Sequence, residues 1–137
     1  MATDIWINLP VRDVKKSKEF FTKLGFAFDT KYGDTETTAG MRIGDKKVVV
    51  MLIVESSFKQ FVGNTISDTK QGNEVLFSLG AASRQEVDDM AKKAEEAGGT
   101  VFGKPGEHSD WMYGCGFTDL DGHRWNALYM DMSKMPK

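Results

Sequence analysis

The sequence has almost no cysteine: Cys115 is the single one among its 137 residues. An internal disulfide is therefore impossible, and a reducing compartment fits this composition best. The chain does not begin with a basic segment and a long apolar run, so we expect no signal peptide. The longest apolar run, Val48–Val54, is far shorter than the roughly 20 residues of a membrane-spanning helix. We therefore expect a cytoplasmic protein without a membrane partner.

An excess of charge of one sign is also missing. The chain has 18 Lys and Arg against 20 Asp and Glu, a formal net charge of −2. Because no basic stripe is available to neutralise phosphates, we expect no nucleic-acid partner. Its 40% hydrophobic and 28% charged residues are typical of a globular protein, and the length suits one domain, 1–137, with its own core.

A strand followed by a helix begins the chain. Apolar residues alternate through 5–11, as in a strand with one buried face, and Asp13 follows as a candidate N-cap. Apolar residues then recur at helical spacing until Gly25, which can end the helix in the left-handed conformation. Three further strands are predicted at Phe26–Thr30, Thr38–Ile43 and Lys47–Val54, the last two joined by a hairpin turn at Gly44-Asp45.

The same order of elements is repeated later in the chain. Apolar residues alternate through 74–80, Ser83 and Glu86 form a capping-box signature, and Gly98 with Gly99 ends the second helix. Three more strands are predicted at Thr100–Phe102, Met112–Thr118 and Arg124–Met130.

The repeat predicts an α+β fold made of two βαβββ modules. The first module covers 1–62, a polar linker rich in turn formers covers 63–72, and the second module covers 73–137. Neither module can bury the faces of its strands alone. We therefore expect the sheets of the two modules to combine into a curved mixed sheet around a shared concavity.

Period two also assigns strand residues to the two faces of the sheet. The odd positions of 5–11 are apolar and are expected to pack under the helices. The opposite, inner face is predicted to carry Trp6, Asn8, Pro10, Glu74, Leu76, Ser78, Arg124, Asn126 and Leu128. Both faces of Lys47–Val54 are apolar, and the position in the hairpin places Val49, Met51 and Ile53 on the inner face as well. A few polar groups among bulky apolar ones are typical of a small-molecule site. The alternative is a partly buried Glu74–Arg124 pair, with the two amides satisfying strand ends.

Three segments, Val11–Phe26, Glu86–Val101 and Phe117–Tyr129, resemble the glyoxalase/bleomycin-resistance/extradiol dioxygenase (vicinal oxygen chelate) superfamily. The last is similar to the family's strand–Asp-Pro-Asp-Gly–strand ending, with Leu120 in place of proline. The resemblance covers nearly the whole chain. It implies the glyoxalase-like fold and a homodimer, because modules of this family often complete their concavities with the partner's strands.

In metal-using members of this family, each of four inner strands supplies one ligand. Matched strand by strand, these positions fall at Trp6, Met51, Glu74 and Asn126. Only Glu74 is a competent ligand, since an indole cannot bind a metal, a thioether suits soft ions and a carboxamide binds weakly. Glu55 lies close to Met51, but even this replacement would give two carboxylates and no imidazole. The resemblance therefore implies a member without a metal or another cofactor.

The histidines and the cysteine do not replace that centre. His123 follows an Asp-Gly turn, where a solvated residue is expected. His108 lies in a polar segment, Lys104–Trp111, predicted to be a loop; there a general base is the alternative to simple exposure. Cys115 has no histidine nearby in its predicted strand and is interpreted as a small core residue.

Three functions remain open. The leading one is a metal-independent small-molecule-binding protein of the bleomycin-resistance type, in which Trp6, Phe28, Trp111 and Tyr113 supply stacking area and Glu74 attracts a cation. For Phe28 and Tyr113, core packing is an equal alternative. The second is a diverged lyase or dioxygenase-like enzyme for a small carbonyl or phenolic compound, with Glu74 as the best catalytic candidate. The third is a structural or partner-binding dimer without a ligand.

The predicted site depends most on Trp6 and Glu74. They are expected at corresponding places, the starts of the two inner strands, and so to point into one concavity. An indole beside a carboxylate suits a flat or cationic ligand. The alternative is that Trp6 fills the space that a metal would otherwise take. The complete set of predicted ligand-binding residues is Trp6, Asn8, Met51, Glu74, Ser78, Trp111, Tyr113, Arg124 and Asn126.

Overall fold

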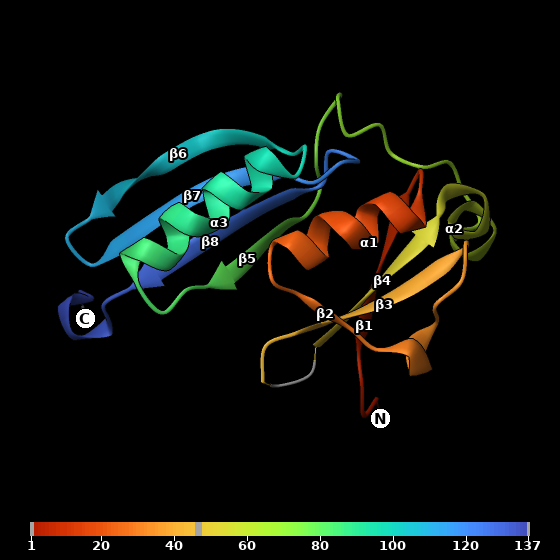
Figure 1. The fold of residues 1–137 in the computed structure, drawn as a ribbon, viewed down its shortest axis with the longest axis horizontal. Helices are drawn as coiled ribbons and strands as arrows, with labels where there is room; N and C mark the ends of the chain where they lie inside the picture. The colour runs from red at the N-terminus through yellow and green to blue at the C-terminus, as the bar shows by residue number, and fades with distance from the viewer. Residues whose placement is uncertain (1, 46–47, 137) are drawn as a thin grey trace. The chain divides into compact units, whose positions relative to one another are not determined.

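The computed structural model describes residues 2–45 and 48–136 and forms two compact units, with the boundary after Asp68 (Figure 1). This boundary lies inside the predicted linker, 63–72. The structure has no helix or strand there, since the preceding helix ends at Val62. The predicted start of a strand at Lys47 lies outside the described residues. The single-domain organisation and the shared concavity stay predictions.

The first unit is a four-stranded sheet in the order β1-β4-β3-β2, with β1 and β4 parallel and the other pairs antiparallel. Helix α1 packs on one face of it, as Figure 1 shows. Its elements are β1 (Trp6–Val11), α1 (Val14–Lys23), β2 (Ala27–Phe28), the 3-10 turn η1 (Thr30–Tyr32), β3 (Thr38–Ile43), β4 (Val48–Val54) and α2 (Glu55–Val62).

The second unit repeats this topology, with strand order β5-β8-β7-β6, a parallel β5–β8 pair and α3 packed on one face. The two βαβββ modules predicted from the sequence are therefore confirmed. Its elements are β5 (Leu76–Gly80), α3 (Arg84–Glu96), β6 (Thr100–Ser109), β7 (Met112–Thr118), β8 (Arg124–Met130) and the 3-10 turn η2 (Met132–Lys134).

Side-chain caps start both long helices where the sequence predicts them. The carboxylate of Asp13 accepts the backbone N–H of Lys16 at 3.0 Å. The hydroxyl of Ser83 accepts the N–H of Glu86 at 3.1 Å, and the Glu86 carboxylate accepts the N–H of Ala82 at 2.9 Å. Each cap satisfies a donor that a helix start leaves without a partner, so the helices begin at these residues.

Each unit has its own core between the sheet and its long helix. In the first unit, α1 covers the strand face that carries the odd residues of β1, as period two predicts. Its most buried side chains are Val11, Phe20, Phe21, Met41, Val50 and Leu52. In the second unit they are Val87, Ala94, Phe117, Trp125 and Ala127. The other face of the first sheet is partly open: Trp6 and Asn8 are exposed there, whereas Val49 and Ile53 are buried.

Four sequence-based boundaries are corrected. The strand predicted at 5–11 begins at Trp6, and Ile5 is 83% exposed instead of buried. The strand predicted at 74–80 begins at Leu76, so Glu74 lies on an exposed bend ahead of it. The strand predicted at Phe26–Thr30 is only Ala27–Phe28, because the N-cap Asp29 turns the following residues into η1.

The fourth correction concerns the predicted loop Lys104–Trp111, most of which belongs to β6. This strand pairs with β7 through a register with several irregularities and forms the edge of its sheet. An edge strand needs no apolar alternation, so its polar residues suggested a loop. Helix α2 was not predicted at all, because none of its residues is buried and no side chain caps it.

A buried carboxylate closes the turn between β7 and β8. Asp119 is 4% exposed, and its Oδ1 accepts the backbone N–H groups of Asp121 and His123 at 3.0 Å. Its Oδ2 accepts the indole N–H of Trp125 at 3.1 Å. Burial raises the pKa of Asp119, although the charge of His123 and the indole N–H act in the opposite direction. This carboxylate therefore joins the turn to the core.

Replacing Asp119 with alanine removes the acceptor of three N–H groups at once. Because each buried donor left without a partner costs about 1–3 kcal/mol, we expect Asp119→Ala to lower the free energy of unfolding by roughly 3 kcal/mol. Urea unfolding followed by circular dichroism measures the loss. The matched control is Glu95→Ala, an exposed position on α3 in the same unit. Equal stability of the two variants would contradict this role of Asp119.

Candidate functional site

A hollow lies on the open face of the first sheet, opposite α1. Its volume is about 910 Å³. The strands β1, β3 and β4 form its floor, and η1 and α2 add to its wall. The hollow is lined by Asp4, Ile5, Trp6, Asn8, Tyr32, Thr38, Val49, Met51, Ile53 and Phe61.

The strand register explains which side chains meet in this hollow. Trp6 pairs with Val49 and Asn8 pairs with Met51 across the parallel β1–β4 ladder. Residues that pair across a ladder point to the same face, and alternate residues of one strand share that face. Trp6, Asn8, Val49, Met51 and Ile53 were all predicted on the inner face, and the structure brings them together.

Three aromatic rings line the hollow, and each comes from a different element. Trp6 on β1 is 59% exposed, Tyr32 on η1 is 37% exposed and Phe61 on α2 is 75% exposed. The indole of Trp6 is therefore not enclosed in a core. Sequence reasoning missed Tyr32 and Phe61, because η1 and α2 have no apolar period that would reveal them.

The position of Tyr32 depends on a glycine in β3. Gly40 has no side chain, and a Cβ there would overlap the Cβ of Tyr32 and lie 3.3 Å from the sulfur of Met51. The backbone of β3 also fixes η1, since the N–H of Asp29 donates to the carbonyl of Gly40 at 3.0 Å. Gly40 therefore lets Tyr32 lie close against the sheet at one side of the hollow.

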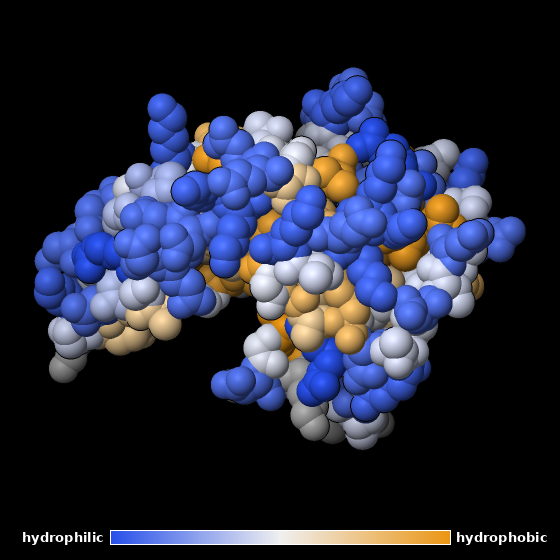
Figure 2. Space-filling view, in the orientation of Figure 1, coloured by the Kyte–Doolittle hydropathy of each residue, from blue (hydrophilic) through white to orange (hydrophobic). Residues whose placement is uncertain are grey.

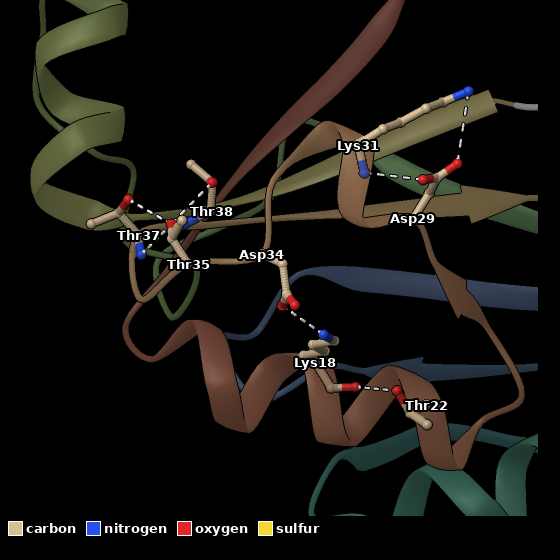
Figure 3. A network of polar contacts seen from close by, with 8 residues as sticks. All are labelled: Lys18, Thr22, Asp29, Lys31, Asp34, Thr35, Thr37 and Thr38. Carbon is tan, nitrogen blue, oxygen red and sulfur yellow. Dashed lines mark hydrogen bonds and ion pairs between the residues drawn. The ribbon is translucent and has the colours of Figure 1, made fainter.

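A cluster of threonines fixes the end of the hollow where Thr38 lies (Figure 3). The hydroxyl of Thr35 accepts the backbone N–H groups of Thr37 and Thr38, both at 3.1 Å, and lies 3.3 Å from the Thr38 hydroxyl. The neighbouring Asp34 forms an ion pair of 2.8 Å with Lys18 of α1. These contacts connect this rim of the hollow to the helix on the other face of the sheet.

Pro10 lies on β1, and the second sheet holds Leu76, Ser78, Arg124, Asn126 and Leu128 of the predicted inner face. Ser78 pairs with Asn126 across the β5–β8 ladder, and the guanidinium of Arg124 lies 4.2 Å from the ring centroid of Phe102. Among the described residues, no hydrogen-bond partner reaches the buried Oδ1 of Asn126. Glu74 lies exposed before β5 starts.

Tyr113 is on the wrong face for the predicted site. It pairs with Tyr129, on the face of β7 and β8 that carries the buried Cys115 and Ala127. Its hydroxyl donates to the carboxylate of Asp88 on α3 at 2.6 Å, and this hydrogen bond raises the pKa of Tyr113. Tyr113 therefore packs toward the helix, as the alternative of core packing proposed.

Trp111 and the remaining candidates do not form a second centre. Trp111 is half-buried in the turn between β6 and β7, where its carbonyl accepts the N–H of Asp131 at 2.7 Å. His108 is exposed on β6, and His123 is half-buried in the turn that Asp119 closes. Cys115 is buried, which raises the pKa of its thiol, so it is a core residue as predicted.

The donor atoms of the open faces do not fit a divalent metal. Of the four expected metal positions, Trp6 has no ligand atom, Met51 offers a thioether, Asn126 an amide and Glu74 lies outside its strand. Within residues 2–45 and 48–136, no group of three or more His, Cys, Asp or Glu is placed to hold a metal. A structural or catalytic metal needs about three such ligands.

The sequence matches the model of the Glyoxalase/Bleomycin resistance protein/Dioxygenase superfamily over residues 5–127. The chain therefore belongs to this superfamily, as the three resembling segments indicated. Among curated proteins, the comparison finds no match. Residues 2–45 and 48–136 contain no helix with the length and hydropathy to cross a membrane.

Solved structures with the same fold include a hypothetical protein from S. aureus, 36% identical, with a TM-score of 0.83 and coverage of 94% of this chain and 95% of that one. A family enzyme from Burkholderia phytofirmans is 16% identical, with a TM-score of 0.77 and coverage of 92% and 97%. A glyoxalase-related enzyme from Fulvimarina pelagi is 15% identical, with a TM-score of 0.80 and coverage of 94% and 88%. These structures agree with the α+β fold described here.

Phe61 lines the hollow but is largely exposed, so it should contribute little to the stability of the core. We expect Phe61→Ala to change the free energy of unfolding by less than about 0.5 kcal/mol, as at other surface positions. The matched variant Phe21→Ala, at a core position that is 1% exposed, is expected to lose about 4 kcal/mol. Urea unfolding of both variants makes the comparison. A loss of several kcal/mol in Phe61→Ala would mean that α2 belongs to the core.

Proposed function

We propose that this protein binds a small molecule without a metal, in the hollow on the first sheet. One observation carries the proposal: the open face of β1 and β4 presents aromatic and apolar side chains where metal-using relatives need ligands. Trp6 and Met51 stand at two of these positions, and both line the hollow. The lining supports stacking and van der Waals contact with a ligand instead of coordination of a metal.

The size and chemistry of the hollow support a small organic ligand. Its volume of about 910 Å³ lies within the roughly 300–1,000 Å³ of typical ligand pockets. Its lining combines apolar residues with an amide from Asn8, a hydroxyl from Thr38 and a carboxylate from Asp4. A few polar groups among apolar and aromatic ones orient a ligand while the apolar area binds it.

Binding is favoured over catalysis by the scarcity of groups that exchange protons near neutral pH. Of the ten lining residues, Asp4 is the one with a carboxylate, and none is His, Cys or Lys. A general acid or base works best with a pKa close to the working pH. Glu74, the catalytic candidate from the sequence, lies exposed on a bend of the second unit. The homodimer and the cytoplasmic location stay predictions.

The first prediction of this proposal concerns metal content. Purified, tag-free protein is expected to carry far less than about one zinc, nickel, iron or manganese ion per chain, because the site lacks three good ligands. Elemental analysis after gel filtration gives the ratio. Addition of each ion in slight excess should also leave the melting temperature unchanged, since a ligand that binds the folded state stabilises it. One tightly held ion per chain would contradict metal independence.

The second prediction concerns Trp6. We expect Trp6→Ala to weaken binding of the neutral fluorescent probe N-phenyl-1-naphthylamine by about tenfold, because a stacking surface is lost. The free energy of unfolding should change by less than about 1 kcal/mol, since the ring is largely exposed. The matched control is Trp111→Phe, in the second unit, which should leave probe binding unchanged.

The two measurements on Trp6→Ala together decide between a site and a filled space. A loss of about 3 kcal/mol or more of stability, with probe binding intact, would mean that the indole only fills a gap in the fold. Probe binding that no variant of the hollow weakens would place the site elsewhere and contradict the proposed function.

A further inference from the structure

Asp4 supplies the single charge in the lining of the hollow. The other nine lining residues are apolar, aromatic or carry a neutral amide or hydroxyl. Asp4 lies two residues before β1, beside Ile5 and Trp6, which also line the hollow. The sequence predicted a carboxylate next to Trp6, but assigned that role to Glu74. The structure places Asp4 there within the same unit.

Two cationic side chains of the same unit share a single anionic partner, Asp29. The ammonium of Lys31 lies 3.8 Å from Oδ2 of Asp29, and the guanidinium of Arg42 lies 3.7 Å from the same oxygen. The contact described for the carboxylate of Asp4 is a hydrogen bond of 3.3 Å from the hydroxyl of Thr3, a neutral group. The negative charge of Asp4 is therefore available to a ligand.

The aromatic wall favours a positively charged ligand, as the carboxylate of Asp4 does. The face of an aromatic ring is negative and attracts a cation that lies over it. The ring of Tyr32 already carries such a cation, because the ammonium of Lys31 lies 5.0 Å from its centroid. The exposed rings left for a ligand are those of Trp6 and Phe61. A cation in the hollow is thus attracted by these two rings and by the carboxylate of Asp4, whereas an anion is repelled by them.

We propose that Asp4 sets the charge preference of the hollow, so that its ligand is a flat, aromatic-sized molecule with a positive charge. This inference rests on the proposed function, since it names the class of ligand for the same site. Asp4 acts as a specificity-determining residue: the rings bind any flat molecule, and the carboxylate selects cations among them. Because Asp4 is exposed, water screens part of the attraction, and the preference is moderate.

The test uses three probes of nearly the same shape at pH 8. They are 9-aminoacridine, a cation; acridine, which is neutral; and acridine-9-carboxylate, an anion. Fluorescence titration of the full chain gives a dissociation constant for each. We expect the order cation, neutral, anion from tightest to weakest. We expect Asp4→Asn to weaken binding of the cation by about fivefold, as for a partly exposed charge pair, and to leave binding of acridine unchanged.

Two matched variants remove the same charge elsewhere. The first is Glu19→Gln, at an exposed position of α1, which packs on the face opposite the hollow. The second is Glu74→Gln, which removes the carboxylate that the sequence favoured. Neither should change binding of any probe. Raising the salt concentration from about 0.05 to 0.5 M should weaken binding of the cation to the wild type and have little effect on its binding to Asp4→Asn.

The outcomes separate this inference from the proposed function. If none of the three probes binds, the proposed function fails and the charge preference fails with it. If all three bind alike and Asp4→Asn has no effect, the hollow is a binding site but Asp4 does not select charge. A cation affinity that falls equally in Glu19→Gln, or only in Glu74→Gln, would also overturn the role of Asp4.

Discussion

The parallel ladder between β1 and β4 is the constraint on which the first unit depends. It aligns Trp6 with Val49 and Asn8 with Met51, and so decides which side chains share the face opposite α1. Because the helix covers one face, the apolar residues of that face form the core, and the other face is free to vary. A shift of this ladder by one residue would exchange the two sets of side chains. Core and site are thus fixed by the same backbone hydrogen bonds.

Local signals in the sequence predicted the elements, and period two predicted the faces. Asp13 and Ser83 marked helix starts because a cap depends on residues only three positions apart. The inner positions of Trp6 and Asn8 followed from alternation and that of Met51 from its place in the hairpin, and all three line one hollow. Tyr32 and Phe61 could not be found in this way, because they lie in short elements, η1 and α2, without any buried residue.

The carboxylate expected beside Trp6 shows where an argument from repetition fails. Both inner strands were expected to begin at equivalent residues, which placed Glu74 as the counterpart of Trp6. Trp6 is the first residue of its ladder with β4, whereas the ladder of β5 begins two residues after Glu74. Alternation gives the face of a residue but not the place where a strand starts, since that depends on hydrogen bonds to a distant partner strand. Asp4, outside any strand, carried no sequence signal at all.

The form of the hollow depends on the backbone of its strands, and its chemistry depends on side chains such as Trp6 and Met51. The floor of the hollow depends on the ladder, on the close approach of Tyr32 to Gly40 and on the threonine cluster around Thr35. The ladder includes Trp6 and Met51, but its hydrogen bonds come from their backbone and not from their side chains. The proposed function takes Trp6 and Met51 to stand where metal-using members of the superfamily hold a metal. A metal binds a ligand through directed bonds, whereas rings and a carboxylate act through area and charge. The proposed site would therefore select its ligand by flatness and by sign of charge, with no need for two neighbouring oxygen atoms.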